Sequence, residues 1–118
     1  MTLGKLIRLL EGEDPANQVR FDFGGLVPRQ LDSWRGVYAE LALGYDDQWR
    51  NPVTVAELLV ELRSAIGKTF TGYKGGDFKM DEGTKVWADN YGEYNQCAIV
   101  GLADCSYRTV LATAFIEN

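Results

Sequence analysis

The middle of the chain holds the stretch on which the fold assignment depends, and it reads Lys68-Thr-Phe-Thr-Gly-Tyr-Lys-Gly-Gly-Asp-Phe-Lys-Met-Asp81. It begins with a β-branched and aromatic run that is typical of a strand, and three glycines follow. Glycine supplies the positive φ angles that tight turns require, so the sequence predicts a strand followed by a glycine turn. The stretch also combines aromatic side chains with lysine and aspartate. We therefore expect it to be the most favourable place for a site.

An amphipathic helix is predicted directly before this stretch. Thr54 is followed three residues later by Glu57, and this spacing is typical of a capping box, in which each side chain bonds the other residue's backbone N–H. Apolar residues then recur along one helical face, and Gly67 provides the cap at the far end. The members of this apolar stripe are Val55, Leu58, Leu59, Leu62 and Ile66.

A second amphipathic helix is predicted near the start of the chain, from Leu3 to Glu11, with Thr2 as its N-cap. Gly12 and the Asp14-Pro15 pair should end it, because proline cannot continue the helical hydrogen-bond ladder. The two helices align at an offset of 52 residues. Either a duplicated helix-strand unit or the general likeness of capped amphipathic helices explains that match.

Alternating apolar residues predict strands on both sides of the second helix. The expected strands lie near residues 19–23, 33–45, 84–89, 97–102 and 107–116. Gly24-Gly25 and Pro28 should end the first of them. A turn near 103–106 would place Cys97 opposite a residue near Ala112, too far from Cys105 for a disulfide.

The fold class that follows is α+β: a mainly antiparallel sheet of five to six strands with two amphipathic helices packed on one face. An open β-barrel decorated by helices is the alternative. At 118 residues, the chain has the length of a single domain, and we expect residues 1–118 to form one.

Charge and composition exclude several classes of function. The formal net charge of −5 does not favour binding to nucleic acid phosphates, and the acidic residues are too scattered for a mimic of a DNA backbone. No segment approaches the ~18 apolar residues of a membrane span, and the opening segment does not fit a signal peptide. We therefore expect a cytoplasmic protein with no membrane partner and no direct contact with nucleic acid.

The sequence shows no recognisable catalytic centre. It contains no histidine, which removes the usual general base near neutral pH and half of the usual zinc ligands. Asp77 and Asp81 near Lys74 and Lys79 would be the remaining acid-base candidates, but such a turn is more often simply solvated. We expect no enzymatic activity, no metal and no cofactor.

Aromatic and basic residues instead favour a binding surface, since tryptophan, tyrosine and arginine provide large contact areas with a polar group. The predicted binding residues are Tyr73, Lys74, Gly75, Gly76, Trp87, Tyr91, Trp34 and Arg35. Alternatively, Trp34 and Trp87 cover a second small core on the outer face of the sheet. The segment Gly72 to Gly76 could also hold a phosphate, although it lacks the Gly-Lys-Ser/Thr of a P-loop.

A resemblance to small uncharacterised accessory proteins of tailed bacteriophages supports the binding interpretation. Residues 2–19, with a short helix, an Asp-Pro turn and a strand, resemble the start of such proteins. Phe70-Thr-Gly-Tyr-Lys-Gly-Gly-Asp-Phe78 and Val86-Trp-Ala-Asp-Asn-Tyr-Gly92 are also similar to phage sequences. The resemblance implies a protein that acts in the cytoplasm of the host cell and binds a host protein. Such proteins include inhibitors of anti-phage systems, for example anti-CRISPR proteins.

The sequence is also compatible with partners other than a host protein. The lysine-glycine turn could bind a small anionic ligand such as a signalling nucleotide, and the resemblance also allows a minor structural role in the virion. The same aromatic residues could serve a homodimer.

Overall fold

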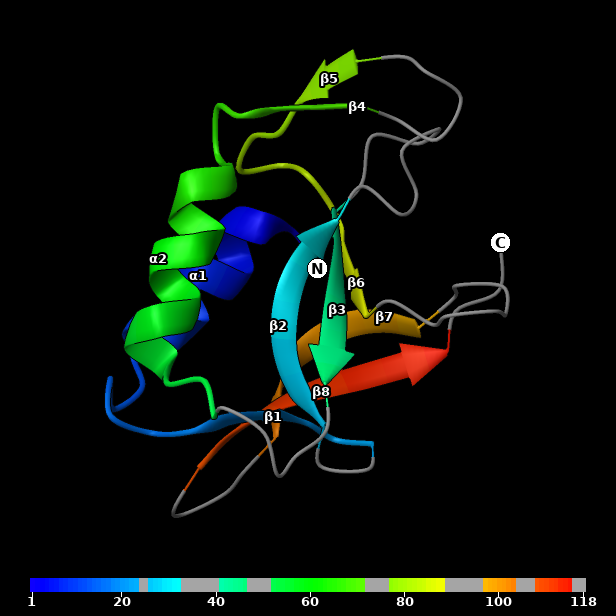
Figure 1. Cartoon of the computed structure of the whole chain (residues 1–118). Helices are drawn as coiled ribbons and strands as arrows, with labels where there is room; N and C mark the ends of the chain where they lie inside the picture. Colours follow the sequence, from blue (N-terminus) through cyan, green and yellow to red (C-terminus); the bar gives the residue numbers. More distant parts are fainter. Residues whose placement is uncertain are drawn as a thin grey trace.

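A computed structural model of the protein describes residues 1–23, 26–32, 41–46, 52–71, 77–88, 97–103 and 108–115 (Figure 1). These residues form two helices, α1 (Leu3–Glu11) and α2 (Val55–Ala65). They also form eight strands: β1 (Val19–Phe21), β2 (Val27–Asp32), β3 (Leu41–Asp46), β4 (Thr69–Thr71), β5 (Asp77–Lys79), β6 (Val86–Ala88), β7 (Cys97–Ala103) and β8 (Thr109–Phe115).

Six of the strands form one sheet in the order β1-β8-β7-β6-β3-β2, and β4 pairs with β5 in a separate two-stranded sheet. The predicted α+β class is confirmed. The prediction of a mainly antiparallel sheet is correct only in part, because the six-stranded sheet is mixed. β2–β3, β6–β7 and β7–β8 are antiparallel, whereas β1–β8 and β3–β6 are parallel.

The parallel pair β3–β6 follows from the position of α2. Parallel neighbours need a long crossover connection, usually one that contains a helix. The chain from β3 to β6 passes through α2 and then through the β4–β5 hairpin. The hairpin is therefore an insertion between the helix and the second strand of a β-α-β crossover.

Both helices begin with the threonine caps that the sequence predicts. Thr2 accepts a hydrogen bond from the Lys5 backbone N–H. Thr54 and Glu57 form the complete capping box. Helix α2 ends at Ala65, and Gly67 follows with a φ of 82°, a left-handed conformation that favours glycine.

The hydrophobic core lies between the helices and the six-stranded sheet. Figure 1 shows both helices on the same side of the sheet. Their apolar stripes are buried together with side chains from β1, β2, β3, β6, β7 and β8, with one exception. Ile66, predicted as the last member of the second stripe, follows the end of α2 and is exposed. The largest fully buried side chains are Phe21, Leu3, Leu6, Leu10, Leu41, Leu43, Leu62, Met80, Ile99, Leu111, Val19 and Val27.

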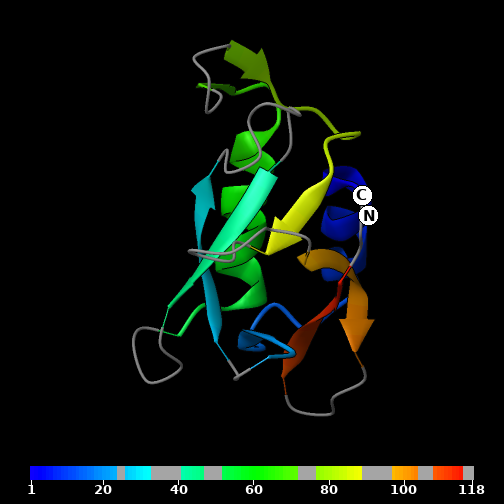
Figure 2. The ribbon, with the colours of Figure 1, turned by 90° about the vertical axis from the view of Figure 1, so that its right-hand side faces the viewer.

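The sheet is curled, so that its first and last strands approach each other (Figure 2). β1 and β2 stand at opposite ends of the strand order, yet the Phe21 N–H donates to the carbonyl of Leu26, just before β2, at 2.8 Å. Asp22 extends the contact between β1 and β8, because its N–H donates to Leu111 O at 3.0 Å. The arrangement lies between the open sheet and the open barrel that the sequence left as alternatives.

Two details of the strands differ from the predictions. Pro28 does not end a strand but belongs to β2, at the edge of the sheet and beside a register shift. Proline is tolerated there because an edge strand has N–H groups that need no ladder partner. Of the strand predicted over 33–45, residues 41–45 belong to β3, in which Leu41 and Leu43 are buried. Residues 33–40 lie outside the described part.

The pairing of β7 with β8 is also shifted from the predicted one. Cys97 lies opposite Phe115, and it is Gly101 that lies opposite Ala112. The pairing begins at Ala103 with Val110, so the connection is longer than a turn at 103–106, and a register shift between Ile99 and Gly101 adds to the difference. Cys105 lies outside the described residues.

The two helix-strand units are placed differently in the fold. The strand after α1 joins the six-stranded sheet, whereas the strands after α2 form the separate hairpin. The N-cap residue of each helix nevertheless forms the same kind of contact, an isolated antiparallel β-bridge of the backbone. Thr2 pairs in this way with Lys85, and Thr54 pairs with Gln18.

Candidate functional site: the β4–β5 hairpin

The central stretch 68–81 forms an antiparallel hairpin. The register pairs Thr69 with Lys79, Phe70 with Phe78 and Thr71 with Asp77. Residues 72–76 connect the two strands and lie outside the described part. Figures 1 and 2 both show the hairpin standing beyond the six-stranded sheet, at the C-terminal end of α2. The expected strand is thus present, and it is paired with a second strand that begins at Asp77.

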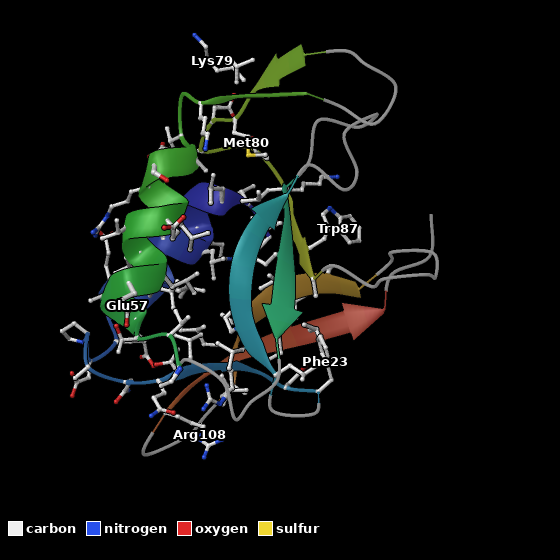
Figure 3. The ribbon with its side chains drawn as sticks, viewed as in Figure 1. Phe23, Glu57, Lys79, Met80, Trp87 and Arg108 are labelled. Carbon is white, nitrogen blue, oxygen red and sulfur yellow. The ribbon has the colours of Figure 1, made fainter. Side chains whose placement is uncertain are left out.

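The base of the hairpin is fixed to the end of α2. The Gly67 N–H donates to Met80 O at 2.7 Å, the Met80 N–H donates to Lys68 O at 3.1 Å, and the Lys68 N–H donates to Ala65 O at 3.1 Å. Met80 is fully buried and belongs to the hydrophobic core. Figure 3 shows Met80 directed toward the body of the molecule and Lys79 directed away from it. The hairpin therefore starts from a rigid base.

A short turn fixes the other side of the base to α1. Within this turn, the Asp81 N–H donates to Thr84 Oγ1 at 3.0 Å, and Asp81 Oδ1 accepts the Gly83 N–H at 2.8 Å. The Glu82 carbonyl accepts the Gly4 N–H at 2.9 Å, and the Thr84 carbonyl accepts the Leu3 N–H at 2.7 Å. These carbonyls satisfy two of the N–H groups that the first turn of a helix leaves without intrahelical partners.

The hairpin carries a different charge from the rest of the protein. Residues 68–79 contain three lysines and one aspartate, a formal charge of +2, whereas the rest of the chain holds nine basic and sixteen acidic residues, a charge of −7. Lys68 and Lys79 are both exposed. The hairpin is thus a basic projection on an acidic protein, and its chemistry suits an anionic partner.

Most of the predicted binding residues lie outside the described part. Tyr73, Lys74, Gly75 and Gly76 belong to residues 72–76, which connect β4 to β5 in the sequence. Nothing is described for Trp34, Arg35 and Tyr91. Their assignment as binding residues stays a prediction.

Trp87 is the predicted site residue that the structure describes, and it is buried. It lies on β6 with 5% of its surface exposed, opposite Ala98 on β7. Its neighbours Val86 and Ala88 belong to the main core, and Trp87 does not. Figure 3 shows its ring on the side of the sheet away from the helices. This burial favours the second small core for Trp87, whose part in binding stays a prediction.

A polar cluster at the opposite end of the molecule was missed by the sequence analysis. Arg20 on β1 is 8% exposed, and its Nη2 donates to Gln18 Oε1 at 2.8 Å. Burial lowers the pKa of Arg20, and the charge of Arg108 lowers it further. The alternation of Arg20 with Val19 and Phe21 predicts a solvated arginine, and no signal in the sequence indicates its burial.

Thr109 connects this cluster to the segment that follows α1. Its hydroxyl donates to Glu13 Oε1 at 3.1 Å and accepts from Asn17 Nδ2 at 3.4 Å. The Thr109 N–H donates to Gln18 O at 2.9 Å. Because Thr109 is 1% exposed, these bonds satisfy polar groups that would otherwise be costly to bury. The cluster joins the start of β8 to the chain before β1, which is a structural role.

Within the described ranges, no group of three or more histidine, cysteine, aspartate or glutamate side chains is placed to hold a metal ion. Neither α1 nor α2, the helices of that part of the chain, is long and apolar enough to cross a membrane. Comparison of the chain with protein-family models, with curated proteins and with solved structures found no match.

Proposed function

We propose that this protein binds a host protein through the β4–β5 hairpin, in the cytoplasm of an infected bacterium, and that the complex inhibits an anti-phage defence system. One observation carries the proposal. The hairpin is inserted in the crossover from β3 to β6 and takes no part in the six-stranded sheet.

The insertion is not needed to connect the two parallel strands. A crossover between parallel strands needs the helix but not a hairpin after it. Of residues 68–80, the described member of the core cluster is Met80, at the base. Exposed segments that a rigid scaffold holds in place are where binding residues concentrate.

The anchored base makes the hairpin suitable for recognition. An isolated two-stranded ribbon is at best marginally stable in water. Here the hydrogen bonds of Gly67, Lys68 and Met80 hold the first pair of the ribbon in register. Such preorganisation lowers the entropy that binding must overcome.

The predicted contact residues are consistent with this role. Tyr73 and Lys74 belong to residues 72–76, which connect the two strands in the sequence. Tyrosine contributes a large contact area with few rotatable bonds, and lysine contributes charge. The resemblance of the hairpin sequence to accessory proteins of tailed phages supports a host protein as the partner.

The sharpest test removes the hairpin and leaves its base. Lys68 O accepts the Met80 N–H at 3.1 Å, so these two residues face each other across the ladder. An Asn-Gly pair closes such a gap as a two-residue hairpin turn. A variant in which Asn-Gly replaces residues 69–79 should therefore fold, with a single cooperative thermal transition.

The variant, the unchanged protein and a Tyr73→Ala, Lys74→Ala double variant serve as baits in lysates of host cells that express anti-phage systems. We expect one partner to be recovered by the unchanged protein and lost from both variants. A Val60→Ala, Lys5→Ala double variant, which changes an exposed valine and an exposed lysine on the two helices, is the matched control and should retain the partner. Equal recovery by the shortened variant would contradict the proposal.

A small anionic ligand is the second candidate for the same hairpin. Its support is the charge of +2 over residues 68–79, together with three glycines at 72, 75 and 76 whose N–H groups could approach a phosphate. Native mass spectrometry after incubation with a panel of nucleotides tests it. A spectrum that shows the bare protein alone would count against the ligand, and the same spectrum reports a homodimer.

A further inference from the structure

We infer that two copies of this chain pair through the outer edge of β5, so that their hairpins join into one four-stranded ribbon in the order β4-β5-β5-β4. The inference goes beyond the proposed function, because its partner is a second copy of the chain and no host protein is needed. It is carried by the place of β5 in the molecule, by the register of the hairpin and by the sequence Asp77-Phe-Lys79.

The outer edge of β5 faces away from the body of the protein. β4 and β5 form a sheet of their own, which no other strand of the described residues joins. Figures 1 and 2 both show β4 between β5 and the rest of the molecule. An edge strand presents a row of N–H and C=O groups to which another strand can bind. Among the described elements, none covers this edge.

The hydrogen bonds at the base of the hairpin show which backbone groups of β5 point outward. Along an antiparallel pair, residues that exchange bonds with the partner strand alternate with residues whose N–H and C=O point away from it. Met80 lies opposite Lys68 when the register is continued, and the Met80 N–H donates to Lys68 O at 3.1 Å. Phe78, two residues before Met80, therefore bonds β4. The N–H and C=O groups of Asp77 and Lys79 point to the outer edge.

The outer edge of β5 is complementary to its own copy. When two β5 strands run antiparallel with Phe78 opposite its counterpart, Asp77 of each chain lies opposite Lys79 of the other. Each of these two pairs can exchange both of its backbone hydrogen bonds, because the groups concerned already point outward. The two-fold axis passes between the two Phe78 residues, and such closed two-fold symmetry is the commonest kind in homo-oligomers.

The charges of β5 select this register. Opposite charges that face each other across two strands stabilise the pair, and like charges destabilise it. A shift by two residues would place aspartate opposite aspartate or lysine opposite lysine, and a parallel pair in register would do the same. A lone lysine on an edge strand opposes pairing. The aspartate two residues before Lys79 makes antiparallel pairing with a second copy favourable instead.

The dimer should be transient, because its interface is small and the two chains repel each other. The three residues of each β5 bury far less than the ~1,200 Å² of a stable interface. Each chain carries a net charge of −5. At physiological ionic strength the Debye length is about 8 Å, so the repulsion between the two bodies is largely screened when the hairpins meet at their outer edges. We expect a dissociation constant of about 0.1 to 1 mM.

The experiment measures self-association of the full chain and of two charge variants, Asp77→Lys and Lys79→Asp. Sedimentation equilibrium covers about 0.05 to 2 mM protein at about 0.15 M salt. Each variant alone places like charges opposite each other in the dimer, so each should bind itself about fivefold or more weakly than the unchanged protein does. An equimolar mixture of the two should associate about as tightly as the unchanged protein, because aspartate again faces lysine in both pairs.

Glu61→Lys and Lys5→Asp are the matched controls. They change the net charge by the same amounts at exposed positions on the two helices, and their self-association should stay within about twofold of that of the unchanged protein. NMR spectra on dilution locate the interface. The amide protons of Asp77 and Lys79 should shift with concentration more than that of Phe78, which bonds β4 within each chain. Thermal midpoints verify that every variant is folded.

Three results would overturn the inference: an unchanged protein that stays monomeric up to about 2 mM, charge variants that associate as the unchanged protein does, or a mixture that associates no better than its components. None of them decides the proposed function. That proposal fails separately, when the variant with residues 69–79 replaced by Asn-Gly still recovers the host partner.

Discussion

Two threonines at equivalent positions cap the two helices with different numbers of hydrogen bonds. Thr54 Oγ1 accepts the Glu57 N–H at 3.2 Å, and Glu57 Oε1 accepts the Thr54 N–H at 3.3 Å. Thr2 Oγ1 accepts the Lys5 N–H at 3.3 Å, and lysine at this position cannot return the bond. The difference lets the capping box be tested within one protein.

We predict that Thr54→Ala lowers the free energy of unfolding by about 1 kcal/mol, since it leaves backbone donors of the first turn without partners. Urea melts of Thr54→Ala, of Thr2→Ala and of the unchanged protein measure the effect. Thr2→Ala should cost no more than Thr54→Ala, because its cap lacks the reciprocal bond. Superimposable curves for Thr54→Ala and the unchanged protein would contradict the prediction.

Gly4 should resist replacement even though it lies in a helix. Alanine is ordinarily favoured over glycine in a helix by about 1 kcal/mol. A Cβ at Gly4, however, would lie 2.9 Å from Glu82 Cβ and 3.1 Å from Glu82 O. Such overpacking costs about 1 to 3 kcal/mol, which outweighs the helical preference, so we predict that Gly4→Ala destabilises the protein by up to about 2 kcal/mol.

Gly12→Ala is the matched control for Gly4→Ala. The nearest atom to a Cβ at Gly12 is Leu9 O at 3.5 Å, which is an ordinary contact, and its φ of −83° suits alanine. Its effect should stay within about 0.5 kcal/mol. Chemical denaturation of the two variants in parallel measures their free energies of unfolding. If Gly4→Ala is at least as stable as Gly12→Ala, Glu82 moves aside without cost and the prediction is wrong.

At the residue scale, the sequence indicates a face more readily than exposure. Alternation correctly separates Trp87 from Val86 and Ala88, which belong to the main core. It does not show what covers the other face, so the burial of Trp87, at 5% exposure, was one of two alternatives, and the burial of Arg20, at 8% exposure, was not predicted. That information depends on contacts between segments far apart in the chain.

At the scale of elements, Gly67 sets the direction in which the chain leaves α2 for the hairpin. Its φ of 82° is unfavourable for an L side chain, yet a Cβ added at Gly67 would meet no atom within 4 Å. A substitution at Gly67 is therefore opposed by backbone strain alone. At Gly4, by contrast, a substitution is opposed by a steric clash with Glu82.

We predict that Gly67→Ala costs about 1 to 2 kcal/mol, the penalty of a left-handed conformation for an L residue. Gly67→Asn should cost less, because asparagine tolerates this conformation better than other residues do. Thermal unfolding of the two variants tests the order. If alanine and asparagine at 67 have the same midpoint as glycine, the left-handed conformation is not required.

The elements themselves were predictable to different degrees. Both helices were correct because capping signals and apolar periodicity agree at each of them. β2 was missed because Pro28 was interpreted as a breaker, although proline is permitted on an edge strand. The hairpin was indicated by its glycines, but its separation from the main sheet was not.

At the scale of the whole molecule, the parallel pairs determine the shape of the sheet. β1 pairs with β8, which joins the two ends of the chain, and β3 pairs with β6 across α2 and the hairpin. A helix between two strands favours a parallel crossover, so the pairing of β3 with β6 could have been inferred from the element order. The pairing of β1 with β8 has no such local signal, because the two strands lie far apart in the sequence.

The start of the chain is tied into this arrangement, and its titration should be visible in the stability of the whole protein. The Met1 ammonium donates to Ile99 O on β7 at 3.2 Å, and the Val86 N–H donates to Met1 O at 3.2 Å. Partial burial lowers the pKa of this ammonium below its ordinary value, and the charges of Lys5 and Lys85 lower it further.

The sign of the pH dependence follows from this shift. Because the folded protein binds the proton more weakly than the unfolded chain, the unfolded chain holds more protons at pH values between the two pKa values. We predict that stability is fully present above the unfolded pKa of about 8 and falls as the pH decreases through the folded pKa. Histidine is absent from the sequence, so no imidazole titrates in this window.

Urea midpoints between about pH 6 and about pH 9 measure the effect when a protein with a free Met1 amine is compared with its Nα-acetylated form. Acetylation removes the titration but keeps an N–H that can donate to Ile99 O. All side chains are the same in the two forms, so their contributions cancel in the difference between the curves. The free-amine protein should lose stability relative to the acetylated form as the pH falls below 8. Parallel curves across the whole range would mean that the ammonium is as well solvated in the folded protein as in the unfolded chain.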